Sequence, residues 1–185
     1  MNKKKNLTIE ETFALAVQNH KKKNLKVAQN LYKKILKTNP NYAGVCYNLG
    51  ITYKELKEYQ KAISCYEKAI QINPNYAGVY FNLGITFKEL KEYQKAKSCY
   101  EKAIQINPNY ADAHNNLGNI LQELKELQKA KSCYEKLLNL DPTFKKGYSS
   151  YGYLLLKISQ HNKGLTYIRK GDGVIRFTQK NVKII

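Results

Sequence analysis

Apolar residues recur along the chain at spacings of three and four, the spacing of one face of an α-helix. In residues 43–56 this pattern falls on Cys46, Leu49, Tyr53 and Leu56, and in residues 59–72 on Ala62, Tyr66, Ala69 and Ile70. Asn73-Pro74 ends the second segment, because proline disfavours a helical residue before it and lacks the amide hydrogen of a continuing helix. Only Lys57-Glu58 joins the two segments. The sequence therefore predicts two antiparallel, neighbouring helices.

This two-helix pattern repeats every 34 residues. Residues 43–76 and 77–110 are identical at 30 of 34 positions, and residues 111–144 match the second copy at 18 of 34. Weaker copies at 9–42 and 145–171 keep the same phase. A fixed period of this length is the signature of a helical repeat architecture, in which each unit buries its apolar face against its neighbours.

Small residues recur with the same period and predict where helices come close. Gly50, Gly84 and Gly118 lie inside the first helices, where glycine costs up to about 1 kcal/mol relative to alanine. Such a recurrent cost suggests that the second helix of the same repeat leaves no room for a side chain there. Ala62, Ala96 and Ala130 would form the matching small surface, and Tyr66, Tyr100 and Tyr134 would fill the space between repeats.

The spacing of these residues resembles the tetratricopeptide repeat family. In residues 43–76 the signature falls on Leu49, Gly50, Tyr53, Ala62, Tyr66, Ala69 and Pro74. The resemblance implies an all-α, right-handed superhelical solenoid of antiparallel helix pairs over residues 9–171, after a basic tail at 1–8. The last copy departs from the pattern: Gly164 and Gly171 stand where alanine is expected, which predicts a weakened second helix.

In this family the first helices of the repeats line a concave face on which partners lie, so the resemblance implies a binding site for a protein or an extended peptide. Helical spacing then selects the side chains that point into that face. They are Tyr47, Asn48, Ile51, Lys54, Phe81, Asn82, Ile85, Lys88, Asn115, Asn116, Asn119 and Gln122, with Glu55, Glu89 and Glu123 beside them.

Within this set, Asn48, Asn82 and Asn116 form a ladder with the period of the repeat. A side-chain amide offers both a donor and an acceptor, so such a row could pair with the backbone of an extended peptide. The ladder resembles one in the repeat region of O-linked N-acetylglucosamine transferases. Alternatively, the amides pair with neighbouring repeats. Lys54 and Lys88 could favour acidic peptides, or could simply pair with glutamates on the same helices.

The formal charge of +18 is concentrated at the two ends of the chain. Residues 1–40 carry ten lysines and two acids, residues 41–144 thirteen lysines and eleven acids, and residues 145–185 nine cationic residues and one acid. Basic ends could attract nucleic acid or an anionic surface. A Lys-, Asn- and Ile-rich composition from an AT-biased genome is the favoured explanation of these ends. Because no basic stretch is interleaved with exposed aromatic residues in a nucleic-acid motif, nucleic acid is not the favoured partner.

Residues for catalysis or metal binding are not grouped in any recognisable pattern. Cys65, Cys99 and Cys133 recur every 34 residues, too far apart for a disulfide or a shared zinc ion, and Cys46 stands alone. His114 takes the place of Tyr80, which indicates packing. The sequence predicts neither an enzyme nor a cofactor, metal or small-molecule substrate. It contains no apolar run long enough for a signal core or a membrane span, which predicts a cytoplasmic protein.

The character of the sequence changes near the C-terminus. Gly171-Asp172-Gly173 predicts a turn, and the residues that follow to Ile185 have the composition of strands. We therefore expect residues 172–185 to form a β-like tail with no capping helix before it. Such a tail could begin a further domain, as in bacterial proteins in which repeats precede an oxygenase, a sulfotransferase or a glycosyltransferase. Alternatively, it could fold back over the last repeat of a short scaffold.

Overall fold

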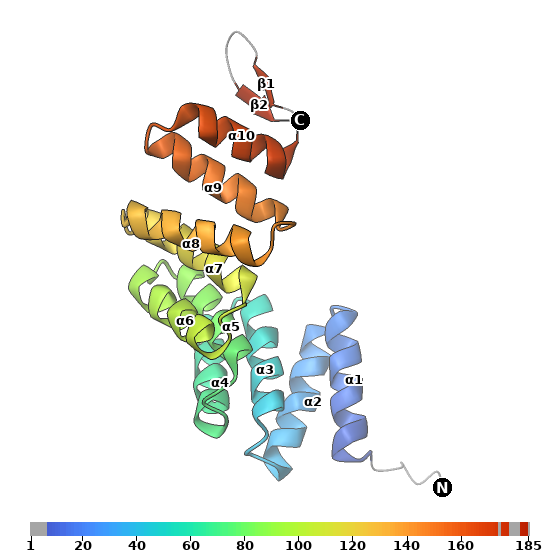
Figure 1. Ribbon diagram of the computed structural model, residues 1–185. Coiled ribbons are helices and arrows are strands. Elements are labelled where there is room, and N and C mark those ends of the chain that lie inside the picture. Colours follow the sequence, from blue (N-terminus) through green and yellow to red (C-terminus); the bar gives the residue numbers. More distant parts are fainter. Residues whose placement is uncertain (1–6, 174, 178–181, 185) are drawn as a thin grey trace, which may run out of the picture. The chain divides into compact units, whose positions relative to one another are not determined.

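The chain folds into helix pairs, and the computed structural model describes residues 7–173, 175–177 and 182–184 (Figure 1). Its helices are α1 (Ile9–Lys21), α2 (Leu25–Thr38), α3 (Ala43–Glu55), α4 (Tyr59–Ile72), α5 (Ala77–Glu89), α6 (Tyr93–Ile106), α7 (Ala111–Glu123), α8 (Leu127–Leu140), α9 (Lys145–Lys157) and α10 (His161–Asp172). The all-α fold predicted from the repeat is confirmed, with helix ends within one residue of those expected for 43–76.

Two compact units divide the chain. The first spans Met1–Leu90 and contains α1 to α5, and the second spans Lys91–Ile185 and contains α6 to α10. The boundary falls in the turn between α5 and α6, so the two helices of the copy at residues 77–110 belong to different units. Within each unit, every helix packs against its neighbour in the chain.

The turns that join two helices of a repeat share one backbone device. Lys57 has φ 60° and Lys125 has φ 60°, a left-handed conformation that ends the helix. In the first of these turns, the amide of Lys57 donates to the carbonyl of Lys54, and the amide of Glu58 to that of Tyr53. A left-handed residue at a helix end satisfies carbonyls that the helix leaves open. The short connection therefore reverses the chain while pairing the carbonyls of Tyr53 and Lys54 at the helix end.

The recurrent glycines lie where the sequence predicts close helix crossings. A Cβ atom on Gly50 would lie 2.5 Å from the ring of Tyr66, and one on Gly118 would lie 2.7 Å from the ring of Tyr134. In both cases the tyrosine comes from the second helix of the same repeat. These rings are fully buried, as are Ala62 and Ala130. The rings thus pack first on the glycine of their own repeat, and Tyr134 also stacks on Tyr151 of the next repeat at 5.9 Å between centroids.

The last helix pair differs from the prediction. α10 is a continuous helix of 12 residues, where the sequence predicted a weakened one. Gly164 is required there: its Cβ would lie 2.9 Å from the carbonyl oxygen of Gly152 on α9. Two facing glycines let the backbones approach more closely than a glycine and an alanine would. Gly171 and Asp172 belong to the last turn of this helix, and only Gly173, with φ 94°, lies in the left-handed region.

Two short strands follow the last helix pair. β1 (Ile175–Phe177) and β2 (Val182–Ile184) pair antiparallel, with Ile175 opposite Ile184. The strand structure predicted for this tail is therefore confirmed for residues 175–177 and 182–184. The predicted tail begins one residue too early, because Asp172 is helical.

Candidate functional site

The residues predicted to form the binding face come from the first helix of each repeat. α3 provides Tyr47, Asn48, Ile51 and Lys54, and α5 provides Phe81, Asn82, Ile85 and Lys88; all eight are partly exposed. α3 contacts both α1 and α5, so these helices form one surface within the first unit. We call the surface made by these eight residues the α3–α5 face.

Asn82 is the centre of a hydrogen-bond network on the α3–α5 face. Its Nδ2 donates to the hydroxyl of Tyr47 at 2.9 Å and to the carbonyl of Gly78 at 3.1 Å. Its Oδ1 accepts from the ammonium of Lys54 at 2.9 Å. Both amide hydrogens are thus used within the protein, two of its three partners coming from the preceding repeat. At this position the ladder pairs with the neighbouring repeat.

Asn48 uses its amide differently. Its Nδ2 donates to the carbonyl of Gly44 at 2.7 Å, one turn earlier in the same helix. A primary amide has two hydrogens and an acceptor oxygen, so this side chain keeps hydrogen-bonding capacity at the surface. The asparagines of the predicted ladder are therefore not equivalent. Asn82 organises the face, whereas Asn48 could still bind a peptide backbone.

Lys54 is the charged group that the α3–α5 face holds most firmly. Burial lowers its pKa, although Glu55 and Glu89 favour the charged form. Among the described residues no carboxylate lies within ion-pair distance of its ammonium, whose fixed partner is the amide oxygen of Asn82. Lys88 instead lies 3.8 Å from Glu89 in an exposed pair. Lys88 therefore pairs with a glutamate of its own helix, whereas Lys54 bonds to an asparagine of the next repeat.

A polar cluster that the sequence analysis missed joins α1 to α3 beside this face. The Nδ1 atom of His20 lies 3.0 Å from the hydroxyl of Thr52, and its Nε2 atom lies 3.1 Å from Glu55. Lys23 donates to the other oxygen of Glu55 at 2.8 Å. Burial disfavours the charged form of Glu55, but the bonds from Lys23 and His20 outweigh it and lower its pKa. These partners are 32 to 35 residues apart, which is close to the 34-residue period. That spacing is the one sequence signal that could have indicated the cluster.

In the second unit one predicted binding residue is buried, and two others hydrogen-bond to a buried tyrosine. Asn115 is buried with 1% exposure, and its Oδ1 has no hydrogen-bond partner among the described residues. Its prediction as an exposed binding residue is wrong, because α7 turns this position inward. Asn119 accepts a hydrogen bond from the Tyr134 hydroxyl at 2.6 Å, and Gln122 donates to that hydroxyl at 2.7 Å. Asn116 is partly exposed.

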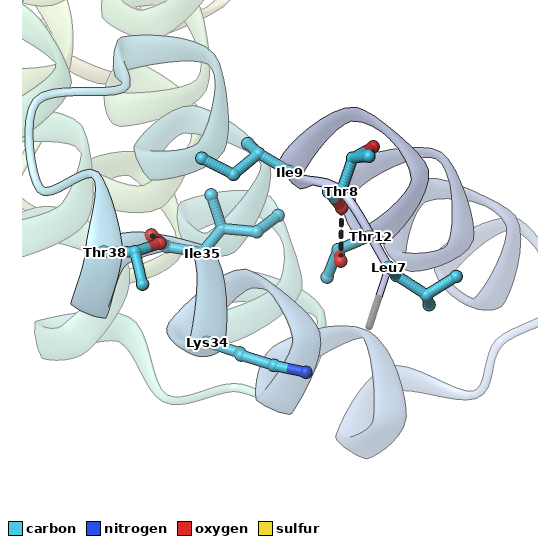
Figure 2. A pocket seen from close by; sticks show the side chains of 7 residues that line it. All are labelled: Leu7, Thr8, Ile9, Thr12, Lys34, Ile35 and Thr38. Atoms are coloured by element: carbon cyan, nitrogen blue, oxygen red, sulfur yellow. Dashed lines mark hydrogen bonds between the residues drawn. The ribbon is translucent and has the colours of Figure 1, made fainter. Parts of the chain in front are cut away.

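The N-terminal end of the first unit carries a pocket of about 300 Å³. Figure 2 shows Ile9 of α1 and Ile35 of α2 directed toward one another, while Lys34 points away from them. The Thr12 hydroxyl donates to the carbonyl of Thr8 at 2.7 Å, so its hydrogen is not available to a ligand. The pocket thus offers chiefly apolar contacts, and its polar groups complete the end of α1.

The four cysteines have free thiols, and burial raises the pKa of each one. Burial raises the pKa of Cys65 and of Cys99 to about 12, and that of Cys133 to about 11. Cys46 is buried, while the three recurrent cysteines are only partly so. Among the described residues no group of histidine, cysteine and carboxylate side chains could hold a metal ion. Within the same residues, no helix is long and apolar enough to cross a membrane.

Comparison with known proteins places these helix pairs in a family. The tetratricopeptide repeat family matches residues 43–76 and 77–110, and a second description of the same repeat matches residues 99–132. A comparison with curated protein sequences finds no match.

Solved structures with the same helix pairs are numerous. A MamA crystal structure is 29% identical with a TM-score of 0.78, covering 84% of this chain and 91% of MamA. YrrB, described as a TPR protein with an unusual peptide-binding site, is 21% identical with a TM-score of 0.73, covering 89% of this chain and 84% of YrrB. PilF of Pseudomonas aeruginosa is 23% identical with a TM-score of 0.80, covering 90% of this chain and 77% of PilF. The helix pairs, the recurrent glycines and these matches together show that the chain belongs to the tetratricopeptide repeat family.

Proposed function

We propose that the chain is a non-catalytic scaffold that binds a protein segment, in extended conformation, on the α3–α5 face. The family and the MamA and YrrB structures support an interaction role. The partly exposed Ile51 and Ile85 would supply apolar contacts, and Asn48 would supply a donor and an acceptor for a peptide backbone.

The observation that carries this proposal is the state of Lys54. Its ammonium has three hydrogens, of which one is fixed on Asn82. Burial makes the charged form costly, as the lowered pKa shows, and the described carboxylates offer no ion pair. A partner with a carboxylate or a backbone carbonyl at this point would complete the coordination of the ammonium. The proposed partner is therefore a segment with an acidic residue or a free carbonyl opposite Lys54.

Substitution of Lys54 tests this function directly. Affinity capture with the immobilised protein would identify a partner, and calorimetric titration would then compare the wild type with Lys54→Met. Methionine keeps the length and apolar character of the stem and removes the charge. Because a hydrogen bond to a charged group contributes about 1.5–3 kcal/mol, we expect binding to weaken roughly tenfold or more.

Lys129→Met is the matched control. Lys129 is an exposed lysine of α8 in the second unit that pairs with Glu126 at 2.7 Å, and it does not belong to the α3–α5 face. Its loss should leave the affinity unchanged. Equal affinities of the Lys54→Met variant and the wild type would show that the partner does not use this face.

A further inference from the structure

A second pocket, in the second unit, lies between α6, α7 and α8 and has a volume of about 270 Å³. Its lining includes Glu101 and Ile104 of α6, His114 and Leu117 of α7, and Cys133 and Lys136 of α8. None of these residues belongs to the α3–α5 face. Their positions within the repeat allow the pocket to be compared with its copy 34 residues later.

In that later copy, aromatic side chains of the chain itself occupy the corresponding positions. Tyr148 and Tyr167 stack at 5.8 Å between ring centroids, and Tyr151 meets Tyr167 edge-on at 4.8 Å. The ammonium of Lys170 lies 5.7 Å from the ring centroid of Tyr148 and 5.6 Å from that of Tyr167, both within cation–π distance. The Tyr151 hydroxyl donates to Glu135 at 2.7 Å.

The earlier copy keeps the charged groups of this arrangement and lacks its rings. Glu101 and Lys136 stand at the positions of Glu135 and Lys170. The three tyrosines are replaced by the smaller His114, Leu117 and Cys133. A pocket is therefore left where the later copy has tyrosine rings, with the acid and the cation still at its edge.

Apart from Glu101 and Lys136, the side chains that line this pocket are uncharged. The Nε2 atom of His114 lies 2.9 Å from the carbonyl oxygen of Pro108, which can only accept, so Nε2 carries the hydrogen and Nδ1 is an acceptor. Burial lowers the pKa of His114, which keeps the ring neutral at pH 7. The Cys133 thiol remains protonated, because burial raises its pKa to about 11. Among the described residues, neither Glu101 nor Lys136 forms an ion pair.

We propose that this pocket binds a tyrosine side chain of a partner protein. The ring would contact Ile104 and Leu117 beneath the ammonium of Lys136, and its hydroxyl would donate to Glu101. In the following repeat, the ammonium of Lys170 lies over tyrosine rings and Tyr151 donates to Glu135. A partner tyrosine in this pocket would make the same two kinds of contact. The site adds a contact that does not depend on the α3–α5 face, so either assignment can fail alone.

Titration of the ¹⁵N-labelled full chain with N-acetyl-tyrosinamide tests the proposal, with N-acetyl-phenylalaninamide as the comparison. We expect saturable amide shifts in α6, α7 and α8, with millimolar affinity for the tyrosine compound. The phenylalanine compound should bind roughly tenfold more weakly, because it lacks the hydrogen bond to the carboxylate. Glu101→Gln should reduce this preference, and Lys129→Met should not change it.

Filling the pocket provides the decisive variants. The double change His114→Tyr and Cys133→Tyr restores two rings of the later copy and should abolish the shifts. Ser132 lines the same pocket and is exposed, so Ser132→Trp should block its mouth without altering the core even if the double variant does not fold. Absence of saturable shifts up to about 20 mM, equal binding of both compounds, or undiminished binding by Ser132→Trp would overturn the proposal.

Discussion

Substitution of Gly118 by alanine tests how tightly the two helices of a repeat are packed. A Cβ at this position would lie 2.7 Å from two ring carbons of Tyr134, closer than carbon atoms approach in folded proteins. The ring cannot move freely, because Asn119 and Gln122 hold its hydroxyl. Overpacking of this kind costs about 1–3 kcal/mol, and the better helix propensity of alanine returns up to about 1 kcal/mol. We expect a net loss of up to about 2 kcal/mol.

Gly78→Ala is the matched control for this measurement. Gly78 also lies in a first helix, but its Cβ would lie 3.5 Å from the nearest atom, the hydroxyl oxygen of Tyr47, which is an ordinary contact. Alanine there should leave stability unchanged or raise it by less than about 1 kcal/mol. Urea unfolding followed by circular dichroism would compare the two variants with the wild type. A Gly118→Ala protein as stable as Gly78→Ala would refute the close crossing.

Further expectations follow from other contacts. Asn119→Ile should cost about 1–3 kcal/mol in urea unfolding, because it removes the acceptor of the Tyr134 hydroxyl; an unchanged midpoint would contradict this network. Lys125→Gly should stabilise the chain by about 1 kcal/mol, since a left-handed residue with φ 60° strains a side chain; lower stability would argue against that conformation. The Cys133 thiol should react slowly with a disulfide reagent at pH 8 and faster only toward its pKa of about 11, and rapid modification of the folded protein at pH 8 would contradict the raised pKa. The pKa of Glu55 is lowered in the folded protein, so its stabilising effect is complete above its unfolded pKa of about 4.3 and is lost as the pH falls through the lower folded value. Glu55→Gln should therefore remove this contribution to the fall of the unfolding free energy in acid.

The repeat pattern predicts those features that depend on period alone. Apolar spacing gives the helices, Asn73-Pro74 gives their ends, and Gly50 and Gly118 give the crossings with Tyr66 and Tyr134. These features succeed because each copy repeats the same contact within itself. A contact inside a 34-residue unit leaves the same residues at the same spacing in successive copies, as Gly50 with Tyr66 and Gly118 with Tyr134 do.

Features that depend on differences between copies could not be predicted in this way. Asn115 occupies the repeat position of Tyr47, yet α7 buries it, because burial there is decided by neighbouring side chains. Gly164 predicts a weak helix by propensity, but its close approach to Gly152 allows a tight helix pair. The bond between His20 and Thr52 joins two copies through a histidine that occurs at its repeat position in one copy only.

We propose that the chain binds a partner segment through the α3–α5 face, with the ammonium of Lys54 as the charged contact. Calorimetric titration of the captured partner into the wild type, the Lys54→Met variant and the Lys129→Met control measures this contribution most directly. Affinity should fall roughly tenfold or more for Lys54→Met alone, since Lys54, unlike Lys129, is held half-buried without a carboxylate partner among the described residues. Identical affinities for all three proteins would place the binding site elsewhere on the chain.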